Sequence, residues 1–154
     1  MKLAALLLGF ALATAPLAQE APSAKLKLPA KVTPGAVVKG TLTVTFADGW
    51  HGYQNPPSDP YQNPVTIALA TKGFKFSKVT YPVGIIKDFA GTKTAVYEGE
   101  ITIPFEFVAP KKVGKLALTF KLDYQQCNEN SCLPPASMTL KGSLDVAKAS
   151  KGGR

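Results

Sequence analysis

The sequence predicts an all-β domain, with an immunoglobulin-like antiparallel sandwich as the first choice. Three observations lead to this fold class. The chain has 154 residues, which suits one domain with one hydrophobic core. Several segments alternate between apolar and polar side chains with the period of two that half-buried strands have. Thirteen glycines and thirteen prolines are scattered along the chain rather than clustered, as is typical of short strands joined by turns.

Four segments carry the alternation most clearly. Their apolar faces are Leu42, Val44 and Phe46; Ile101, Ile103, Phe105 and Phe107; Leu116, Leu118, Phe120, Leu122 and Tyr124; and Met138, Leu140, Leu144 and Val146. Weaker strand candidates are 24–28, 65–70 and 74–81. Turn signals separate these segments, among them Pro34-Gly35, Asp48-Gly49, Lys72-Gly73 and Val113-Gly114. Each apolar face needs a second one to cover it, and two sheets packed face to face provide this. A jelly roll or an open barrel is the alternative.

The two ends of the chain differ from this domain in composition. Residues 1–18 start with Met1-Lys2 and continue as an apolar run to Leu17, which is the plan of a secretory signal peptide. The run is shorter than the roughly 20 residues that span a bilayer, so an uncleaved anchor helix is the less favoured alternative. We therefore expect a periplasmic or otherwise extracytoplasmic protein without stable membrane insertion after cleavage. The expected domain is 25–147, and 148–154 form a flexible basic tail.

The formal charge of +8 could attract nucleic acid or anionic membranes. The lysines, however, are spread along the chain, and the first adjacent pair is Lys111-Lys112. Export also removes the usual nucleic-acid partners. We interpret the charge as a solvated surface and expect no nucleic-acid partner.

The only two cysteines, Cys127 and Cys132, lie in the segment DYQQCNENSCLPP between two predicted strands. Turn-forming and polar residues separate them, so they can meet across a tight turn and should pair in an oxidising compartment. Closing so short a loop stabilises a fold by roughly 2 kcal/mol, less than a bridge between distant strands would. A short-loop disulfide at a domain edge is also accessible to a partner thiolate. The residues alone are therefore compatible with two interpretations, a redox-active pair and an inert structural bridge.

Other chemistry at these cysteines is less favoured. His51 is the only histidine, and a Cys–His hydrolase would have its nucleophile tied up in the bridge. Two thiolates and one distant histidine fall short of a zinc set. Copper(I) could take both sulfurs with Met138, but no methionine-rich cluster supports it. We expect no metal and no cofactor.

At this motif the chain resembles the N-terminal periplasmic (alpha) domain of the thiol:disulfide interchange protein DsbD family. The matching stretches are Tyr124-Gln125-Gln126-Cys127 and Cys132-Leu133-Pro134-Pro135, then the segment 48–53, then 87–91 followed by 96–99. The similarity runs in the same order over roughly residues 25–147. It implies an immunoglobulin-like domain whose cysteines cycle between disulfide and dithiol. The spacing between the cysteines is one residue shorter than in familiar members.

The resemblance also implies roles and partners. Cys132 would form the mixed disulfide with a partner and Cys127 would resolve it. Phe89, beside Asp88, would be the cap of the site, and His51, Tyr53 and Tyr124 would be its neighbours. The implied partners are a thioredoxin-like electron donor and oxidised envelope proteins. A separate membrane electron transporter would replace the further domains of familiar members. Taken by itself, Phe89 in a loop between strands favours a core plug over a lid, and only the resemblance reverses this; Trp50 favours the core.

Overall fold

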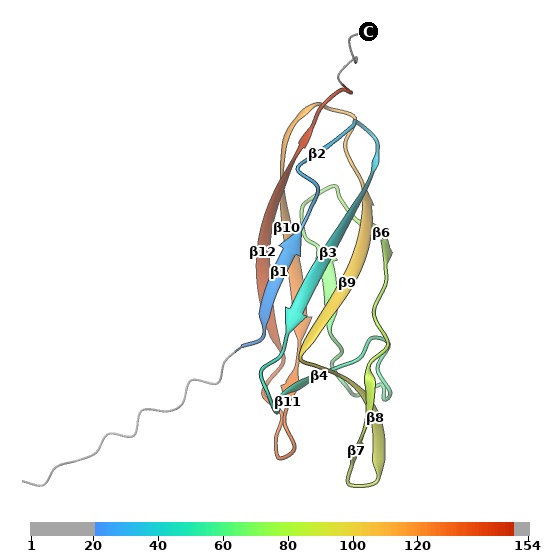
Figure 1. The fold of residues 1–154 in the computed structure, drawn as a ribbon, viewed down its shortest axis with the longest axis vertical. Coiled ribbons are helices and arrows are strands. Elements are labelled where there is room, and N and C mark those ends of the chain that lie inside the picture. Colours follow the sequence, from blue (N-terminus) through green and yellow to red (C-terminus); the bar gives the residue numbers. More distant parts are fainter. Residues whose placement is uncertain (1–20, 150–154) are drawn as a thin grey trace, which may run out of the picture.

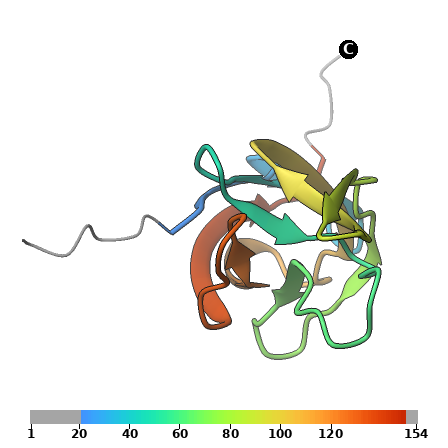
Figure 2. The same cartoon turned by 90° about the horizontal axis from the view of Figure 1, so that it is seen from below.

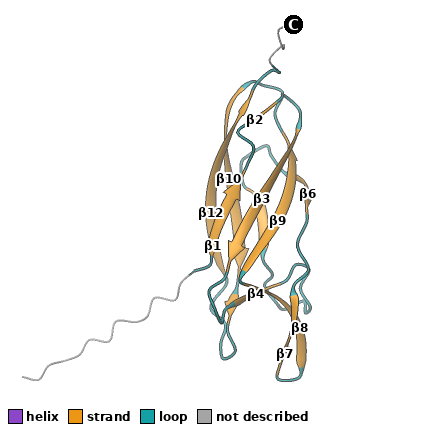
Figure 3. Cartoon of the chain, in the orientation of Figure 1, coloured by secondary structure: helices purple, strands orange, loops and turns teal. Residues whose placement is uncertain are grey.

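The computed structural model describes residues 21–149, which form twelve strands and no helix (Figure 3). The strands are β1 (Ser23–Lys27), β2 (Lys31–Val32), β3 (Val37–Thr45), β4 (His51–Tyr53), β5 (Thr66–Leu69), β6 (Phe76–Val79), β7 (Ile85–Phe89), β8 (Thr92–Glu98), β9 (Glu100–Val108), β10 (Gly114–Tyr124), β11 (Gln126–Cys127) and β12 (Ala136–Val146). No helix in this part of the chain could span a membrane. The expected signal peptide, 1–18, and the end of the basic tail, 150–154, lie outside the described residues.

The strands form three four-stranded sheets. The front sheet has the order β1-β3-β9-β6, the back sheet β2-β12-β10-β5 and the end sheet β11-β4-β8-β7. The front and back sheets face each other as a sandwich (Figures 1 and 2). The end sheet lies at the bottom of the molecule in Figure 1, at the other end from the last residues of β12, and the β7–β8 hairpin and the loop after β11 both project there. Chemistry carried by the end sheet is therefore kept apart from the main core.

Long antiparallel pairings build the two main sheets. In the front sheet β3 pairs with β9 from Val37 opposite Val108 to Thr45 opposite Glu100. In the back sheet β10 pairs with β12 from Gly114 opposite Val146 to Tyr124 opposite Ala136. Valine, isoleucine, threonine and phenylalanine, which favour pleated half-buried surfaces, dominate both strands of the first pair. The cysteine segment is the connection at the tip of the second pair.

Aromatic side chains fill the space between the two main sheets. The Phe105 ring centroid lies 5.0 Å from that of Phe76 and 5.3 Å from that of Phe120. A Cβ atom added to Gly40 would lie 2.5 Å from the Phe105 ring, so glycine at this position lets the ring lie directly under β3. Burying one such phenylalanine contributes about 1.5–3 kcal/mol. The core thus joins both sheets through a few large side chains.

The structure confirms the predicted immunoglobulin-like sandwich and the four strongly alternating segments, which become β3, β9, β10 and β12. The end sheet was not anticipated, because β4 and β11 are too short to show a period and β8 buries four consecutive residues, 94–97. One expectation was wrong: Phe89 is not a loop residue but the last residue of β7. The turn that follows consists of Ala90 and Gly91 alone.

Candidate functional site

The two cysteines form a disulfide across a four-residue turn at the end of the sandwich. Their Cα atoms are 4.0 Å apart. The Asn128 amide donates to the Ser131 carbonyl at 2.9 Å. The Asn128 side-chain oxygen also accepts from the backbone amides of Asn130 at 2.8 Å and Ser131 at 2.9 Å. Asparagine side chains favour turns by such local bonds, and here they fold the segment so that the sulfur atoms meet, as the sequence predicted.

The two halves of the bridge differ in exposure. Cys127 belongs to β11 and is only 1% exposed, whereas Cys132 lies in the loop and is exposed. A thiolate from another protein can therefore approach the Cys132 sulfur more easily than the Cys127 sulfur.

Tyr53 brings a hydroxyl group to both sulfur atoms. Its oxygen lies 3.4 Å from Cys127 Sγ and 3.6 Å from Cys132 Sγ. The neighbouring Gly52 faces the core, where an added Cβ would lie 2.5 Å from the Phe46 ring. Because successive side chains of a strand point to opposite faces, the close fit at Gly52 turns Tyr53 and His51 toward the disulfide side of β4.

His51 lies directly beside Cys127 in the end sheet. The two residues are opposite each other in the β4–β11 pair, and on its other side His51 is opposite Glu98 of β8. His51 is 4% exposed. Burial lowers the pKa of the imidazole below its ordinary value; the Glu98 carboxylate opposes this shift and the Lys87 ammonium adds to it. The imidazole is therefore neutral at neutral pH.

Phe89 covers His51 from the β7–β8 hairpin. The two ring centroids are 4.9 Å apart, with the ring planes 30° from parallel. Ala90 and Gly91 make the hairpin turn with positive φ angles of 53° and 88°, and Asp88 accepts the Gly91 amide at 2.6 Å. Two-residue turns of this kind need positive φ at both positions. The hairpin thus holds the Phe89 ring over the histidine rather than in the main core.

A cleft of about 1020 Å³ lies between the hairpin and the cysteine turn. Its lining includes Trp50, His51, Phe89 and the turn residues 128–130. Lys87 and Glu98, which form an ion pair, also line it. The cleft thus has aromatic and charged walls and reaches the turn between the cysteines, although neither cysteine lines it.

The structure brings together most of the site residues expected from the sequence. Cys127, Cys132, His51, Tyr53, Phe89 and Asp88 gather around the bridge or its adjoining cleft. Tyr124 instead packs into the main core at the end of β10. The Lys87–Glu98 pair and the half-buried Trp50 were not expected at the site. Only the register of β8 against β4 places Glu98 there, and no short motif encodes that register.

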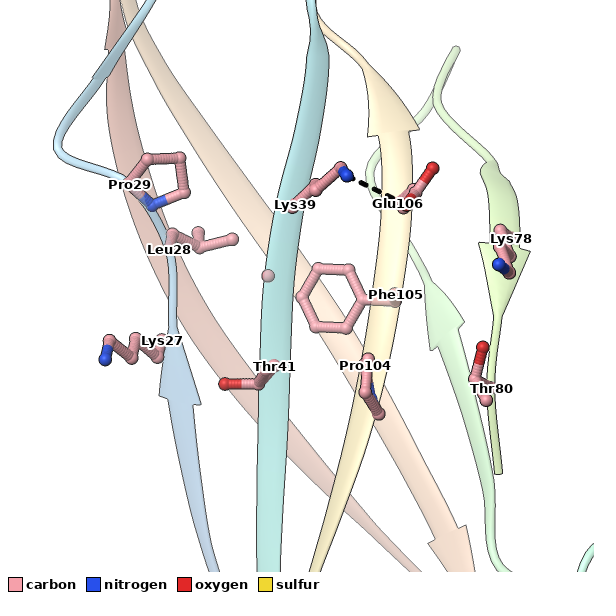
Figure 4. Close-up of a pocket in the computed structure, with 11 residues that line it drawn as sticks. Lys27, Leu28, Pro29, Lys39, Thr41, Lys78, Thr80, Pro104, Phe105 and Glu106 are labelled. Carbon is pink, nitrogen blue, oxygen red and sulfur yellow. Dashed lines mark ion pairs between the residues drawn. The ribbon is translucent and has the colours of Figure 1, made fainter. Parts of the chain in front are cut away.

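A second pocket, of about 490 Å³, lies on the front sheet and shares no lining residue with the cleft (Figure 4). The Phe105 ring and Leu28 lie close to Gly40 on β3. Lys39 and Glu106, whose ion pair is drawn as a dashed line in Figure 4, also line this pocket. Within residues 21–149, no group of three or more histidine, cysteine, aspartate or glutamate side chains could hold a metal ion.

Comparisons with known proteins agree with this architecture. A family model described as the N-terminal region of thiol:disulfide interchange protein DsbD matches residues 18–143. The reduced DsbD N-terminal domain of Neisseria meningitidis is 20% identical, with a TM-score of 0.50 over 79% of this chain and 89% of that one. The N-terminal periplasmic domain of ScsB from Proteus mirabilis is 22% identical, with a TM-score of 0.53 over 80% of this chain and 45% of that one. A search of curated proteins gives no match.

Proposed function

Since the chain belongs to the family of DsbD N-terminal domains, we propose that it is a thiol–disulfide exchange domain that carries electrons between proteins outside the cytoplasm. It accepts electrons from a thioredoxin-like donor and passes them to oxidised envelope proteins. A membrane electron transporter supplies that donor with electrons.

The observation that carries this proposal is the asymmetric disulfide at the tip of the sandwich. An exchange disulfide needs one sulfur within reach of an incoming thiolate, and Cys132 is the exposed one. The bridge closes only its own turn, so opening it leaves the pairings of the two main sheets intact. Both features favour repeated opening and closing over a purely structural role.

The exposure also supports an order of events. A donor thiolate attacks Cys132 Sγ, which forms a mixed disulfide and releases Cys127 as a thiolate. A second donor thiolate then attacks the donor sulfur of that mixed disulfide, and the domain leaves as a dithiol. In the second half of the cycle the Cys132 thiolate attacks a substrate disulfide. Cys127 then attacks Cys132 Sγ, which restores the bridge and releases the substrate as a dithiol.

The neighbouring aromatic residues assist this exchange. The Tyr53 hydroxyl, close to both sulfur atoms, donates a hydrogen bond to whichever thiolate forms. Phe89 is the cap of the site: its ring lies against His51, which is opposite Cys127, and docking of a partner moves the hairpin aside. A ligand or partner can shift such a two-state element when it binds one state better.

The location follows from the same proposal. Residues 1–18 are a signal peptide, 25–147 are the exchange domain and 148–154 are a basic tail. The ScsB domain of similar fold is described as periplasmic, and we assign the mature protein to the same compartment.

The reduction potential of the Cys127–Cys132 pair tests the proposal. A carrier should equilibrate with a thioredoxin-like protein and lie in the range of about −120 to −270 mV that exchange proteins occupy. A potential below about −300 mV, the range of structural bridges, would show instead a binding or accessory domain with an inert disulfide. Mass spectrometry of alkylated thiols after equilibration gives the redox state directly.

A further inference from the structure

A row of three functional side chains crosses the end sheet. Glu98 on β8 is opposite His51 on β4, and His51 is opposite Cys127 on β11. Residues directly opposite each other in antiparallel strands project from the same face, with Cβ atoms about 4.5–5.5 Å apart. The register therefore orders a carboxylate, an imidazole and a sulfur side by side.

We propose that His51 is the base that takes the proton from Cys127 when Cys127 resolves the mixed disulfide, and that Glu98 is a positioning residue that stabilises the imidazolium. This inference rests on the proposed function and deepens it.

The burial of Cys127 is the reason that a base is needed. Only the thiolate attacks a disulfide, and an apolar, buried environment raises the pKa of a thiol. Cys127 is 1% exposed, so bulk water reaches its sulfur poorly. His51 is adjacent, is itself nearly buried, and is neutral at neutral pH because burial holds its pKa down. It can therefore accept the proton where solvent cannot.

The proton and electron balance of the step closes within these groups. The Cys127 thiol transfers its proton to the His51 imidazole, and the thiolate attacks Cys132 Sγ in the mixed disulfide. The Cys127–Cys132 bond forms, the bond to the substrate sulfur breaks, and the substrate thiolate leaves with the electron pair. The imidazolium then gives its proton to that thiolate. When the donor opens the bridge, the proton that the donor's second thiol loses passes through His51 to the departing Cys127 thiolate.

The charged and titratable groups around His51 predict the direction in which its pKa can be moved. From β8, Glu98 raises the pKa; from β7, Lys87 lowers it, and these two form an ion pair. Asp88 and Glu129 line the same cleft. The remaining titratable neighbours are Cys127 and the Tyr53 phenol beside the sulfurs. Glu98→Gln should therefore lower the pKa of His51, and Lys87→Met should raise it.

The test uses the reduced protein and dithiobis(nitrobenzoate) in a stopped-flow instrument. Cys132 attacks the reagent and releases a first thionitrobenzoate; Cys127 then displaces the second in a unimolecular phase. Without a base, a thiol of ordinary pKa, about 8.5, is only about 3% ionised at pH 7, which slows its attack. A thiolate of higher pKa is also more nucleophilic, and this offsets part of the decrease in rate. We expect His51→Gln to slow the second phase about tenfold at pH 7. In a plot of the rate of this phase against pH, the inflection should move from below neutral pH in the wild type to the pKa of an unassisted thiol in the variant.

The two charge variants keep the experiment decisive if His51→Gln folds poorly. Glu98→Gln should move the inflection of the second phase to lower pH and Lys87→Met to higher pH, while the concentration-dependent first phase serves as the internal reference. An unchanged profile in His51→Gln, or charge variants that leave the inflection in place, would overturn the role of His51. A wild-type protein that no thioredoxin-like donor reduces would instead overturn the proposed function, since that measurement does not involve the pH profile.

Discussion

Replacing Phe89 with alanine tests whether this side chain acts as a cap of the site or as a core residue. Phe89 is half-buried and its ring contacts His51. Part of the 1.5–3 kcal/mol for burying a phenylalanine is lost, and so is one aromatic contact of about 0.5–1.5 kcal/mol. We therefore expect the free energy of unfolding to fall by about 1–2 kcal/mol, less than the 3–5 kcal/mol typical of a fully buried phenylalanine. Reduction of the bridge by dithiothreitol should become several-fold faster, because the proposed cap over the site is removed.

Phe74→Ala is the matched control for this variant. Phe74 is also half-buried and makes one aromatic contact, with the Phe107 ring 6.4 Å away, but it lines a pocket away from the disulfide. Chemical denaturation should show a similar loss of stability, and quenched alkylation should show an unchanged rate of reduction. A Phe89 variant that loses 3 kcal/mol or more while its reduction rate stays at the wild-type value would refute the cap.

Three further predictions concern the site. Cys127→Ala should accumulate a mixed disulfide with a thioredoxin-like partner through Cys132, visible on non-reducing gels; accumulation only in Cys132→Ala would reverse the two roles. Tyr53→Phe removes the hydroxyl beside both sulfurs, which weakens the stabilisation of the thiolate, so the reduction potential should become more negative by about 30 mV, the equivalent of 1.4 kcal/mol. The free energy of unfolding should be constant above about pH 6.5 and decline below it, because the pKa of His51 in the folded protein lies under the ordinary value and the unfolded state binds the proton more readily. His51→Gln should remove this decline. An identical dependence of the unfolding free energy on pH in both proteins would exclude His51 as its cause.

The sequence predicts the sandwich well because its main strands are long and regular. In β3 and β9 the alternation of threonine or charged residues with apolar ones reports directly which side faces the core. The cysteine turn is equally local, since Asn128 and its neighbours fold it by bonds within four residues.

The rest of the site depends on register between distant segments. His51 and Glu98 are 47 positions apart and meet only because β4 pairs with β8. Phe89 was expected in a loop because it follows Asp88 and precedes Ala90-Gly91. In the structure Asp88 and Phe89 still pair with β8, and the turn needs only two residues. The exposed Ile85 and Ile86 of β7 show no alternation that would mark it as a strand.

The position of the site at one end of the sandwich has an evolutionary consequence. Cys132 and the turn residues 129–131 are exposed and lie outside the hydrophobic core. Substitutions at exposed positions usually change stability by no more than about 0.5 kcal/mol, whereas core substitutions cost several. The surface that meets a partner can therefore diverge in shape and charge while the two main sheets keep the cysteine turn in place. A duplicated copy of this domain could acquire a new electron donor or a new client through changes in the hairpin and the turn alone.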